Sequence, residues 1–497
     1  MPDAATPQPR RDIPWKGLRV LAIVLLLPIA FLVVAAVMLV DTDIDAPDWV
    51  KSRVEARASA MMQGGEVAFS DVFVNVGRDL HPRVRLVDVK VTDAAGTQIA
   101  RIPAVEAQMS PRGLLFQAEV LFQDVALTGP LINLNRAADG SVVMAFGAGN
   151  GFDETASLVG VLDHVDQYLD APALAALETI SANGVIINYN DARAGRSWTV
   201  DGGVLDLDLR GGQTSLTGDF ALLAGGADIT RLQLGYDSPR GERSAKIGLS
   251  LTNARARDIA TQTPALAWLA DVDAALTASL RTSLDNDGAL GPLSATLDLG
   301  AGALQPNAAT EPVVFDRAKA YLTYDPASDQ IQFDQIEIAT QAGDFRATGQ
   351  AILGEAVDGI PQSLVAQFDL PDARLAQSDF YPEGLQIPPV AIDMRLRLSP
   401  FGIDLGQVVL VDGDTHLTAA GQVSATQDGW QAAIDIKADH IATERLVALC
   451  PIGVKPGSRN WLAQNVSTGD IQDAALALRL RQGTPAAMTG RFDFVDA

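Results

Sequence analysis

The chain has 497 residues, with 37 basic and 61 acidic side chains, a formal net charge of −24 and 48% apolar residues. A surface this acidic repels phosphate backbones and argues against nucleic acid as a partner. The apolar fraction excludes wholesale disorder, and the length allows about three ordinary domains or one elongated repeat array. Cys450 is the only cysteine, so neither an intramolecular disulfide framework nor a cysteine-based zinc site can form.

The first 40 residues have the charge pattern of a membrane anchor. Residues 20–40 contain no ionisable side chain, and a helix of that length spans about 31 Å, close to one bilayer core. Basic residues precede this segment and aspartates follow it, which predicts a cytoplasmic tail over 1–19 and an outward-facing remainder. A cleaved signal peptide and a buried core helix are the alternatives. The predicted anchor is represented by Val20, Leu25, Phe31 and Val40.

Residues 41–65 predict a juxtamembrane amphipathic helix. Asp45 is placed to cap it, Pro47 falls in its first turn, and Gly64 and Gly65 end it. Trp49, together with Arg19 before the span, predicts contact with the membrane interface. A helix that caps the first strands of the next domain is the alternative interpretation.

From residue 66 to 497 the main signal is alternation of apolar and polar residues, which is typical of strands with one buried face. Asp139-Gly140, Asp287-Gly288 and Asp428-Gly429 are hairpin-turn signals between such runs. The expected fold is mainly β: an elongated, curved antiparallel sheet in the form of a groove, with a few short helices. The apolar members of two clean strands are the candidate groove residues: Leu205, Leu207, Leu209, Ile392, Met394, Leu396 and Leu398.

Two kinds of interruption break this alternation. The apolar phase slips at Leu86–Val87 and again within 331–338, which predicts β-bulges and a strongly coiled sheet. Residues 158–169 and 264–276 show helical spacing and predict short caps or plugs.

The sequence contains no recognisable catalytic constellation. The sequence has no G-x-S-x-G turn, and its four histidines are scattered. Paired carboxylates such as Asp412 and Asp414 could in principle hydrolyse glycosides, but most acidic residues of so acidic a chain lie on solvated faces and turns. We therefore expect a protein that is not an enzyme and holds neither metal nor cofactor.

Several segments resemble the AsmA-like proteins of Gram-negative envelopes, and most closely the YhdP-like branch. The anchor followed by 47–51, and a strand pair over 125–140 whose second strand ends in Arg136, are similar to the start of that family. The strand over 177–191 ends in Asp191 and is followed by Gly195-Arg196-Ser197-Trp198, as in the YhdP-like branch. Residues 269–302 are similar to its repeat linker, and 456–471 form the most specific stretch.

The resemblance implies a bridge-like lipid transporter. Such a protein is anchored in the inner membrane, lies in the periplasm, and shelters phospholipid acyl chains on an apolar β-groove on their way to the outer membrane. Each exposed CH₂ of a lipid costs about 0.8 kcal/mol in water, so such a path needs a continuous apolar surface. Members of that branch continue beyond this length, and 492–497 resembles an unfinished strand, so we expect a truncated C-terminus.

Two other functions remain open at this point. The β array could instead be an envelope scaffold or an assembly factor for outer-membrane proteins, with partners bound by edge-strand pairing. An enzymatic function is the least favoured. The lipid, the direction of transport and the choice between an open groove and a filled β core do not follow from the sequence.

Overall fold

A computed structural model describes residues 40, 42–60, 65–79, 81–92, 98–110, 121–138, 142–146, 174–223, 229–357, 359–377, 381–449, 452, 456–466 and 469–495. The chain divides into two compact units. Unit 1 comprises Met1–Thr128 and Leu169–Glu178, and unit 2 comprises Gly129–Tyr168 and Thr179–Ala497. Each is considered by itself below.

Unit 1 is a small antiparallel sheet with one helix. Strand β4 is central, because it pairs with β2, β3 and β5, while β1 pairs with β3 and β6 with β5. The bounds are β1 (Ile44–Asp45), α2 (Asp48–Ala60), β2 (Glu66–Ala68), β3 (Asp71–Val76), β4 (Pro82–Thr92), β5 (Gln98–Met109) and β6 (Phe122–Thr128).

Helix α2 lies within 41–65, where the sequence predicts a helix, but Asp45 does not cap it, because Asp45 pairs with Phe73 in strand β1 and the helix begins at Asp48. Its Val54 and Ala58 pack against a buried cluster that includes Val67 and Val84, so it covers the first strands. The backbone N–H of Val67 donates a 2.9 Å hydrogen bond to Ser59 Oγ, which fixes the end of the helix to β2. The alternative interpretation, a helix that caps the first strands, is therefore confirmed. Trp49 is 67% exposed, and its membrane contact stays a prediction.

The predicted phase slip in β4 is present. Val84 and Val89 are both buried although they are five positions apart, an odd spacing that would place them on opposite faces of a regular strand. Asp88 between them has a positive φ of 51°. The pairing of β4 also changes there, from β3 up to Val87 to β2 from Lys90 onward. The irregular residue lets both halves of one strand face the same core.

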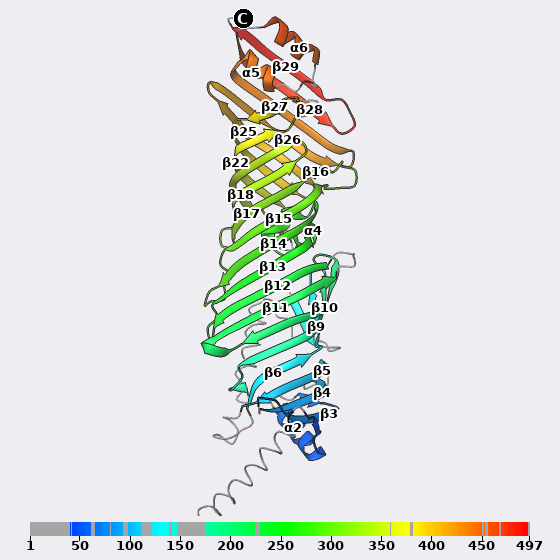
Figure 1. Cartoon of the computed structure of the whole chain (residues 1–497). Coiled ribbons are helices and arrows are strands. Elements are labelled where there is room, and N and C mark those ends of the chain that lie inside the picture. Colours follow the sequence, from blue (N-terminus) through cyan, green and yellow to red (C-terminus); the bar gives the residue numbers. More distant parts are fainter. Residues whose placement is uncertain are drawn as a thin grey trace, which may run out of the picture. The chain divides into compact units, whose positions relative to one another are not determined.

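Unit 2 is dominated by one large sheet whose strands follow one another in chain order, as β11 to β18 show most clearly in Figure 1. Neighbours are antiparallel, except that β7 and β9 are parallel. The predicted mainly β, mostly antiparallel fold is confirmed. Its strands are β7 (Leu131–Arg136), β8 (Val142–Phe146), β9 (Thr179–Asp191), β10 (Arg196–Asp208), β11 (Gln213–Leu223), β12 (Ile229–Pro239), β13 (Ala245–Arg255), β14 (Val272–Leu284), β15 (Leu293–Leu304), β16 (Val313–Phe315), β17 (Arg317–Asp325), β18 (Gln330–Thr340), β19 (Gly343–Leu353), β22 (Ser363–Leu375), β23 (Leu385–Ile387), β24 (Val390–Leu398), β25 (Phe401–Asp412), β26 (Thr415–Thr426), β27 (Gly429–Ala442), β28 (Asp470–Arg481) and β29 (Ala487–Val495).

Short elements lie between these strands. They are η3 (Arg210–Gly212), α4 (Ala256–Ile259), η4 (Pro264–Leu269), the separate strand pair β20 (Ala356–Val357) and β21 (Ile360–Pro361), α5 (Thr443–Leu449) and α6 (Pro456–Asn465). The turn signal at Asp287-Gly288 falls between β14 and β15, as predicted, and the signal at Asp428-Gly429 falls at the junction of β26 and β27, whose first residue is Gly429. The Asp139-Gly140 signal lies outside the described residues.

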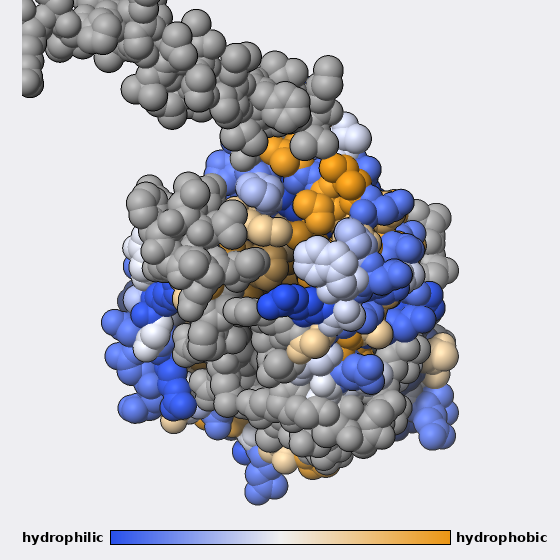
Figure 2. Space-filling view, turned by 90° about the horizontal axis from the view of Figure 1, so that it is seen from below, coloured by the Kyte–Doolittle hydropathy of each residue, from blue (hydrophilic) through white to orange (hydrophobic). Residues whose placement is uncertain are grey.

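Alternation along each strand separates a polar face from an apolar one. In β14, Val272, Ala274, Leu276 and Ala278 are buried, and the residues between them are exposed. Figure 2, the view from below, shows a group of hydrophobic residues in the upper part of the picture and mostly hydrophilic residues at the sides. One face of the sheet therefore forms the interior of unit 2, and the charges lie on the other.

The sheet of unit 2 coils strongly. Its register shifts at bulges, including the predicted one between Phe333 and Ile336. The loop between β15 and β16 reaches strands far along the chain: Trp430 Nε1 donates to Glu311 O at 2.7 Å, and Glu311 N donates to Gln482 Oε1 at 2.9 Å. These contacts bring the loop between β15 and β16 next to strands that follow it by more than 100 residues, so the sheet curves between them.

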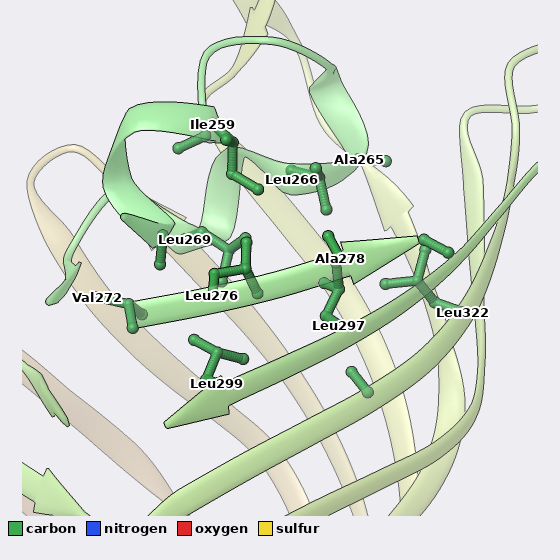
Figure 3. Close-up of a cluster of buried hydrophobic side chains, with 14 of the residues drawn as sticks. Ile259, Ala265, Leu266, Leu269, Val272, Leu276, Ala278, Leu297, Leu299 and Leu322 are labelled. Atoms are coloured by element: carbon green, nitrogen blue, oxygen red, sulfur yellow. The ribbon is translucent and has the colours of Figure 1, made fainter. Parts of the chain in front are cut away.

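The coil encloses a filled hydrophobic core around α4, η4 and the inner face of β13 to β22 (Figure 3). Leu269, Leu276 and Leu297 are completely buried, and Leu322 and Leu364 are nearly so. Leu269 of η4 is buried in this core as completely as the leucines of the strands. In this part of unit 2 the interior is packed with side chains rather than open.

The helix predicted over 264–276 is wrong in its second half. Residues 264–269 form η4, but Leu276 belongs to strand β14, which begins at Val272. Helical spacing holds for Leu266, Leu269 and Ala270, but from Val272 onward every second residue is buried, which is the pattern of a strand.

Two other predictions fall on residues outside the described ranges, namely the helix at 158–169 and most of the anchor at 20–40. Val40, the end of the predicted anchor, forms an isolated parallel bridge with Val76. Among the residues described, no helix combines the length and the hydrophobicity that crossing a membrane requires.

The filled core leads to a stability prediction. Leu297→Ala should lower the free energy of unfolding by about 2–5 kcal/mol, because Leu297 is completely buried and the truncation leaves a cavity. Ile352→Ala on β19, where the side chain is 54% exposed, should change it by less than about 0.5 kcal/mol. Urea unfolding followed by circular dichroism measures both. Equal losses of stability in the two variants would contradict a packed interior around Leu297.

Candidate functional site

The interior of unit 2 contains a cavity of about 500 Å³ beside the filled core. This volume lies within the range of about 300–1,000 Å³ that is usual for small-molecule sites. Its walls come from β9 to β15 and from α4, η4 and the residues between them. Most of the lining is apolar, and Leu232, Leu249, Leu251 and Leu280 lie on three neighbouring strands of it.

The strand register explains the apolar wall. Leu249 on β13 lies opposite Leu280 on β14, and Leu251 lies opposite Leu232 on β12. Directly opposed residues in antiparallel strands point to the same face. Alternation along each strand therefore places a continuous row of leucines on the interior side.

Aromatic residues form a second wall. Trp198 on β10 lies opposite Tyr189 on β9, and their rings stack with centroids 5.4 Å apart and planes at 18°. Nearby, Phe220 covers the backbone of two glycines. A Cβ at Gly203 or Gly218 would come within 2.5 Å and 2.6 Å of the Phe220 ring, so a larger residue at either position would displace it.

One end of the cavity is closed by residues 256–271, here named the plug, which connect β13 to β14. Arg255 and Ala275 are paired neighbours, so a tight turn of a few residues could have joined these strands. The plug instead turns inward. Ala256, Ala265, Leu266 and Leu269 are at most 1% exposed, and Ile259 and Leu266 face the cavity.

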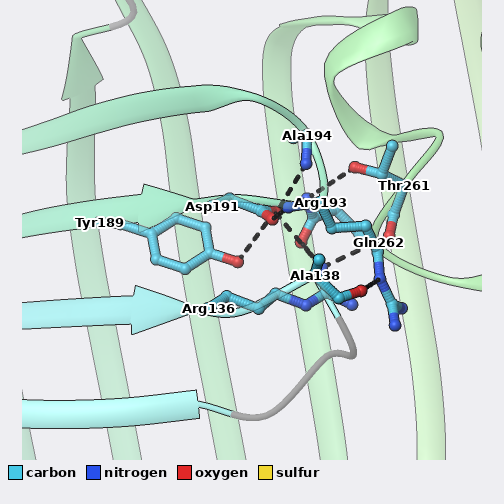
Figure 4. A network of polar contacts seen from close by, with 8 residues as sticks. All are labelled: Arg136, Ala138, Tyr189, Asp191, Arg193, Ala194, Thr261 and Gln262. Atoms are coloured by element: carbon cyan, nitrogen blue, oxygen red, sulfur yellow. Dashed lines mark hydrogen bonds and ion pairs between the residues drawn. The ribbon is translucent and has the colours of Figure 1, made fainter. Parts of the chain in front are cut away.

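A polar clamp holds the plug beside the cavity (Figure 4). It consists of Arg136, Tyr189, Asp191 and Gln262, and its centre is the completely buried carboxylate of Asp191. Asp191 Oδ2 accepts hydrogen bonds from Gln262 Nε2 at 2.8 Å, Tyr189 Oη at 3.1 Å and Arg136 Nη1 at 3.4 Å. Asp191 Oδ1 accepts from the backbone N–H groups of Arg193 and Ala194.

Arg136 completes the clamp from the end of β7. Its Nη1 also donates to Gln262 Oε1 at 3.1 Å and to the backbone carbonyl of Thr261 at 3.4 Å. A second attachment joins Arg196 to Asp258 of α4, with 2.7 Å between Nη1 and Oδ1. Residues far apart in the sequence thus hold the plug in one position.

The clamp changes the protonation of its members. Burial raises the pKa of Asp191, but the hydrogen bonds from Gln262, Ala194 and Tyr189 and the charge of Arg136 outweigh it, so the pKa lies below 3.8. Burial and the Asp191 carboxylate raise the pKa of Tyr189 above 10.0. Asp191 therefore stays ionised and Tyr189 keeps its proton over the physiological range.

Two cations, Arg255 and Arg281, also line the cavity. Neither forms an ion pair within the described part of the chain, whereas Arg136 and Arg196 do. In a chain with a net charge of −24, these arginines favour an anionic group over a cationic one. No three His, Cys, Asp or Glu side chains of the described residues come together as metal ligands would.

The seven groove candidates lie on or beside two strands and not around the cavity. Leu205 and Leu207 are half-buried on β10, and Leu209 is buried just after it. Ile392 is half-buried on β24, and Met394, Leu396 and Leu398 pack against the filled core. None of them is among the residues that line the described cavity. Their contact with lipid stays a prediction.

Sequence motifs did identify part of the clamp. Three residues of the segments that resemble AsmA-like proteins lie beside the plug in the structure: Arg136, Asp191 and Arg196. Gln262 and the cavity leucines of β13 carried no comparable signal. No model of a known protein family, no curated protein and no solved structure matches the chain.

The buried clamp should make stability depend on Asp191. Asp191→Asn should lower the free energy of unfolding by about 3–5 kcal/mol at neutral pH, because it leaves Arg136 without its buried partner. The native pKa of Asp191 is lowered, so its contribution is complete above 3.8 and is lost as the pH falls through the native value. The difference in free energy of unfolding between the wild type and Asp191→Asn should therefore become smaller below pH 3.8.

Denaturant unfolding at a series of pH values measures this gap. Asp206→Asn, at an exposed carboxylate on β10, is the matched control and should change stability by less than about 0.5 kcal/mol. If the stability difference between the wild type and Asp191→Asn stays constant as the pH is lowered, the lowered pKa of Asp191 is contradicted.

Proposed function

We propose that this chain is a lipid-binding protein that shelters acyl chains on the apolar inner face of unit 2. The observation that carries the proposal is the 500 Å³ cavity, whose walls are leucine rows and a stacked aromatic pair. An apolar cavity of this kind favours a hydrocarbon ligand, because each CH₂ moved out of water contributes about 0.8 kcal/mol. Arg281, at the end of the cavity away from the plug, provides positive charge for an anionic head group.

In the cell, we place this activity in bridge-like transfer of phospholipid between the membranes of a Gram-negative envelope. The apolar, basic-flanked segment at 20–40 would anchor the chain in the inner membrane, and residues after it would lie in the periplasm. The resemblance to AsmA-like proteins supports this placement. The filled core beside the plug restricts the proposal, since a lipid path through it would require the packed side chains to move.

Lipid content tests the binding proposal directly. Full chain purified in a mild detergent should retain phospholipid that mass spectrometry detects in an organic extract. Leu249→Glu should reduce that content several-fold, because it places a charge on the cavity wall. Thr252→Glu, at an exposed position on the same strand, should leave it unchanged.

Circular dichroism has to show that both variants are folded, and Leu280→Gln is a milder second variant on the neighbouring strand. A folded Leu249→Glu or Leu280→Gln protein with the lipid content of the wild type would exclude the cavity as the binding site. A folded wild type without lipid would favour the scaffold function, in which the same array binds envelope proteins.

A further inference from the structure

The cavity and the plug together suggest a limit on ligand length. Along β13 the cavity runs from Ile247 to Arg255, a distance of roughly 26 Å at about 3.3 Å per residue. Arg281 and Thr282 line it beside Ile247, because Thr282 is the register partner of that residue. Ile259 and Leu266 of the plug line it at the other end, next to Ala254.

Beyond Leu266 the interior is closed. Leu266 lies with Leu269, Leu276 and Ala278 in Figure 3, and all four are at most 2% exposed. Leu297 and Leu322 continue the same cluster on the next strands. A hydrocarbon chain that fills the cavity would therefore meet packed side chains at the plug and not an open passage.

The plug is also fixed in place. Asp191 and Arg136 hold Gln262, and Arg196 holds Asp258, so the part of the plug before η4 is attached to strands of the sheet. At its end, Gln305 N donates to Asp271 O at 2.9 Å. These contacts keep Ile259 and Leu266 at a defined distance from Arg281.

We propose that the plug sets the length of acyl chain that this site accepts, with Ile259 and Leu266 as the specificity-determining residues at its closed end. The methyl end of the chain contacts these two residues, and the anionic head group lies toward Arg281. This inference rests on the proposed acyl-chain binding and adds a limit to it. Arg281, which forms no ion pair among the described residues, lies at the end of the cavity away from Ile259 and Leu266. Arg255, Asp258 and Gln262 also line the plug end, where Asp258 is paired with Arg196.

Binding of saturated fatty acids of increasing length tests the limit on the full chain, with a fluorescent fatty acid as the displaced reporter. For the wild type, the dissociation constant should fall about fourfold with each added CH₂ up to a certain length and then level off. A parallel series of lysophosphatidylcholines separates the two sources of acyl chain. The same limiting length in both series is expected, because the plug and not the head group determines it.

Leu266→Ala should move the limiting length to longer chains, by roughly two carbons, because it removes a side chain from the closed end. Leu269→Ala is the matched control: it is the same truncation of a completely buried plug residue, but Leu269 is not among the cavity-lining residues. It should leave the limit unchanged. Should Leu266→Ala fail to fold, Ile259→Val makes a smaller opening at the same end and should give a smaller shift.

Three outcomes would overturn the inference. In the first, the affinity of the wild type keeps rising up to the longest fatty acid. In the second, folded Leu266→Ala has the same limiting length as the wild type. Either result excludes the plug as the limit on chain length and leaves the proposed acyl-chain binding intact. The absence of saturable binding at every length rejects the proposed function and the inference together.

Discussion

The central constraint on this protein is that its main sheet has one apolar face. Alternation in strands such as β14 puts leucines, valines and alanines on one side and charges on the other. A flat sheet of this kind would expose the apolar side to water, so the sheet has to coil around it. The bulge between Phe333 and Ile336 and the contacts of Glu311 with Trp430 and Gln482 are parts of that coil.

Coiling leaves an interior that has to be filled, and the chain fills one part of it with the plug. Leu266 and Leu269 are the apolar side chains that fill the space, but the plug also brings polar groups into the interior. A buried carboxylate is stable only when it is paired and hydrogen-bonded. Asp191 meets this requirement through Arg136, Gln262 and Tyr189, and the same contacts position the closed end of the cavity. Stability and the shape of the site thus depend on the same clamp.

Sequence alone predicted the features with short-range signals. Period-two alternation predicted the antiparallel sheet, the phase slip in 331–338 predicted its bulge, and helical spacing predicted α2 and η4. The prediction of a helix as far as Leu276 was wrong, because period-two alternation replaces the helical spacing from Val272 onward. The clamp could not be derived, because Arg136 and Gln262 are 126 positions apart and only the coil brings them together. The groove candidates were chosen from the strands with the most regular alternation. Alternation indicates which residues face inward, but it does not indicate whether other side chains already fill the space in front of them.

The claim that hydrocarbon occupies the interior of unit 2 is tested most directly by photo-crosslinking. A fatty acid with a photoreactive group in its chain would be bound to the full protein and irradiated, and the modified residues identified by peptide mass spectrometry. The account predicts adducts on inward-facing residues such as Leu232, Leu249 and Leu266, and none on exposed neighbours such as Gln233 and Thr252. Adducts spread over exposed positions, with the cavity leucines unlabelled, would contradict it.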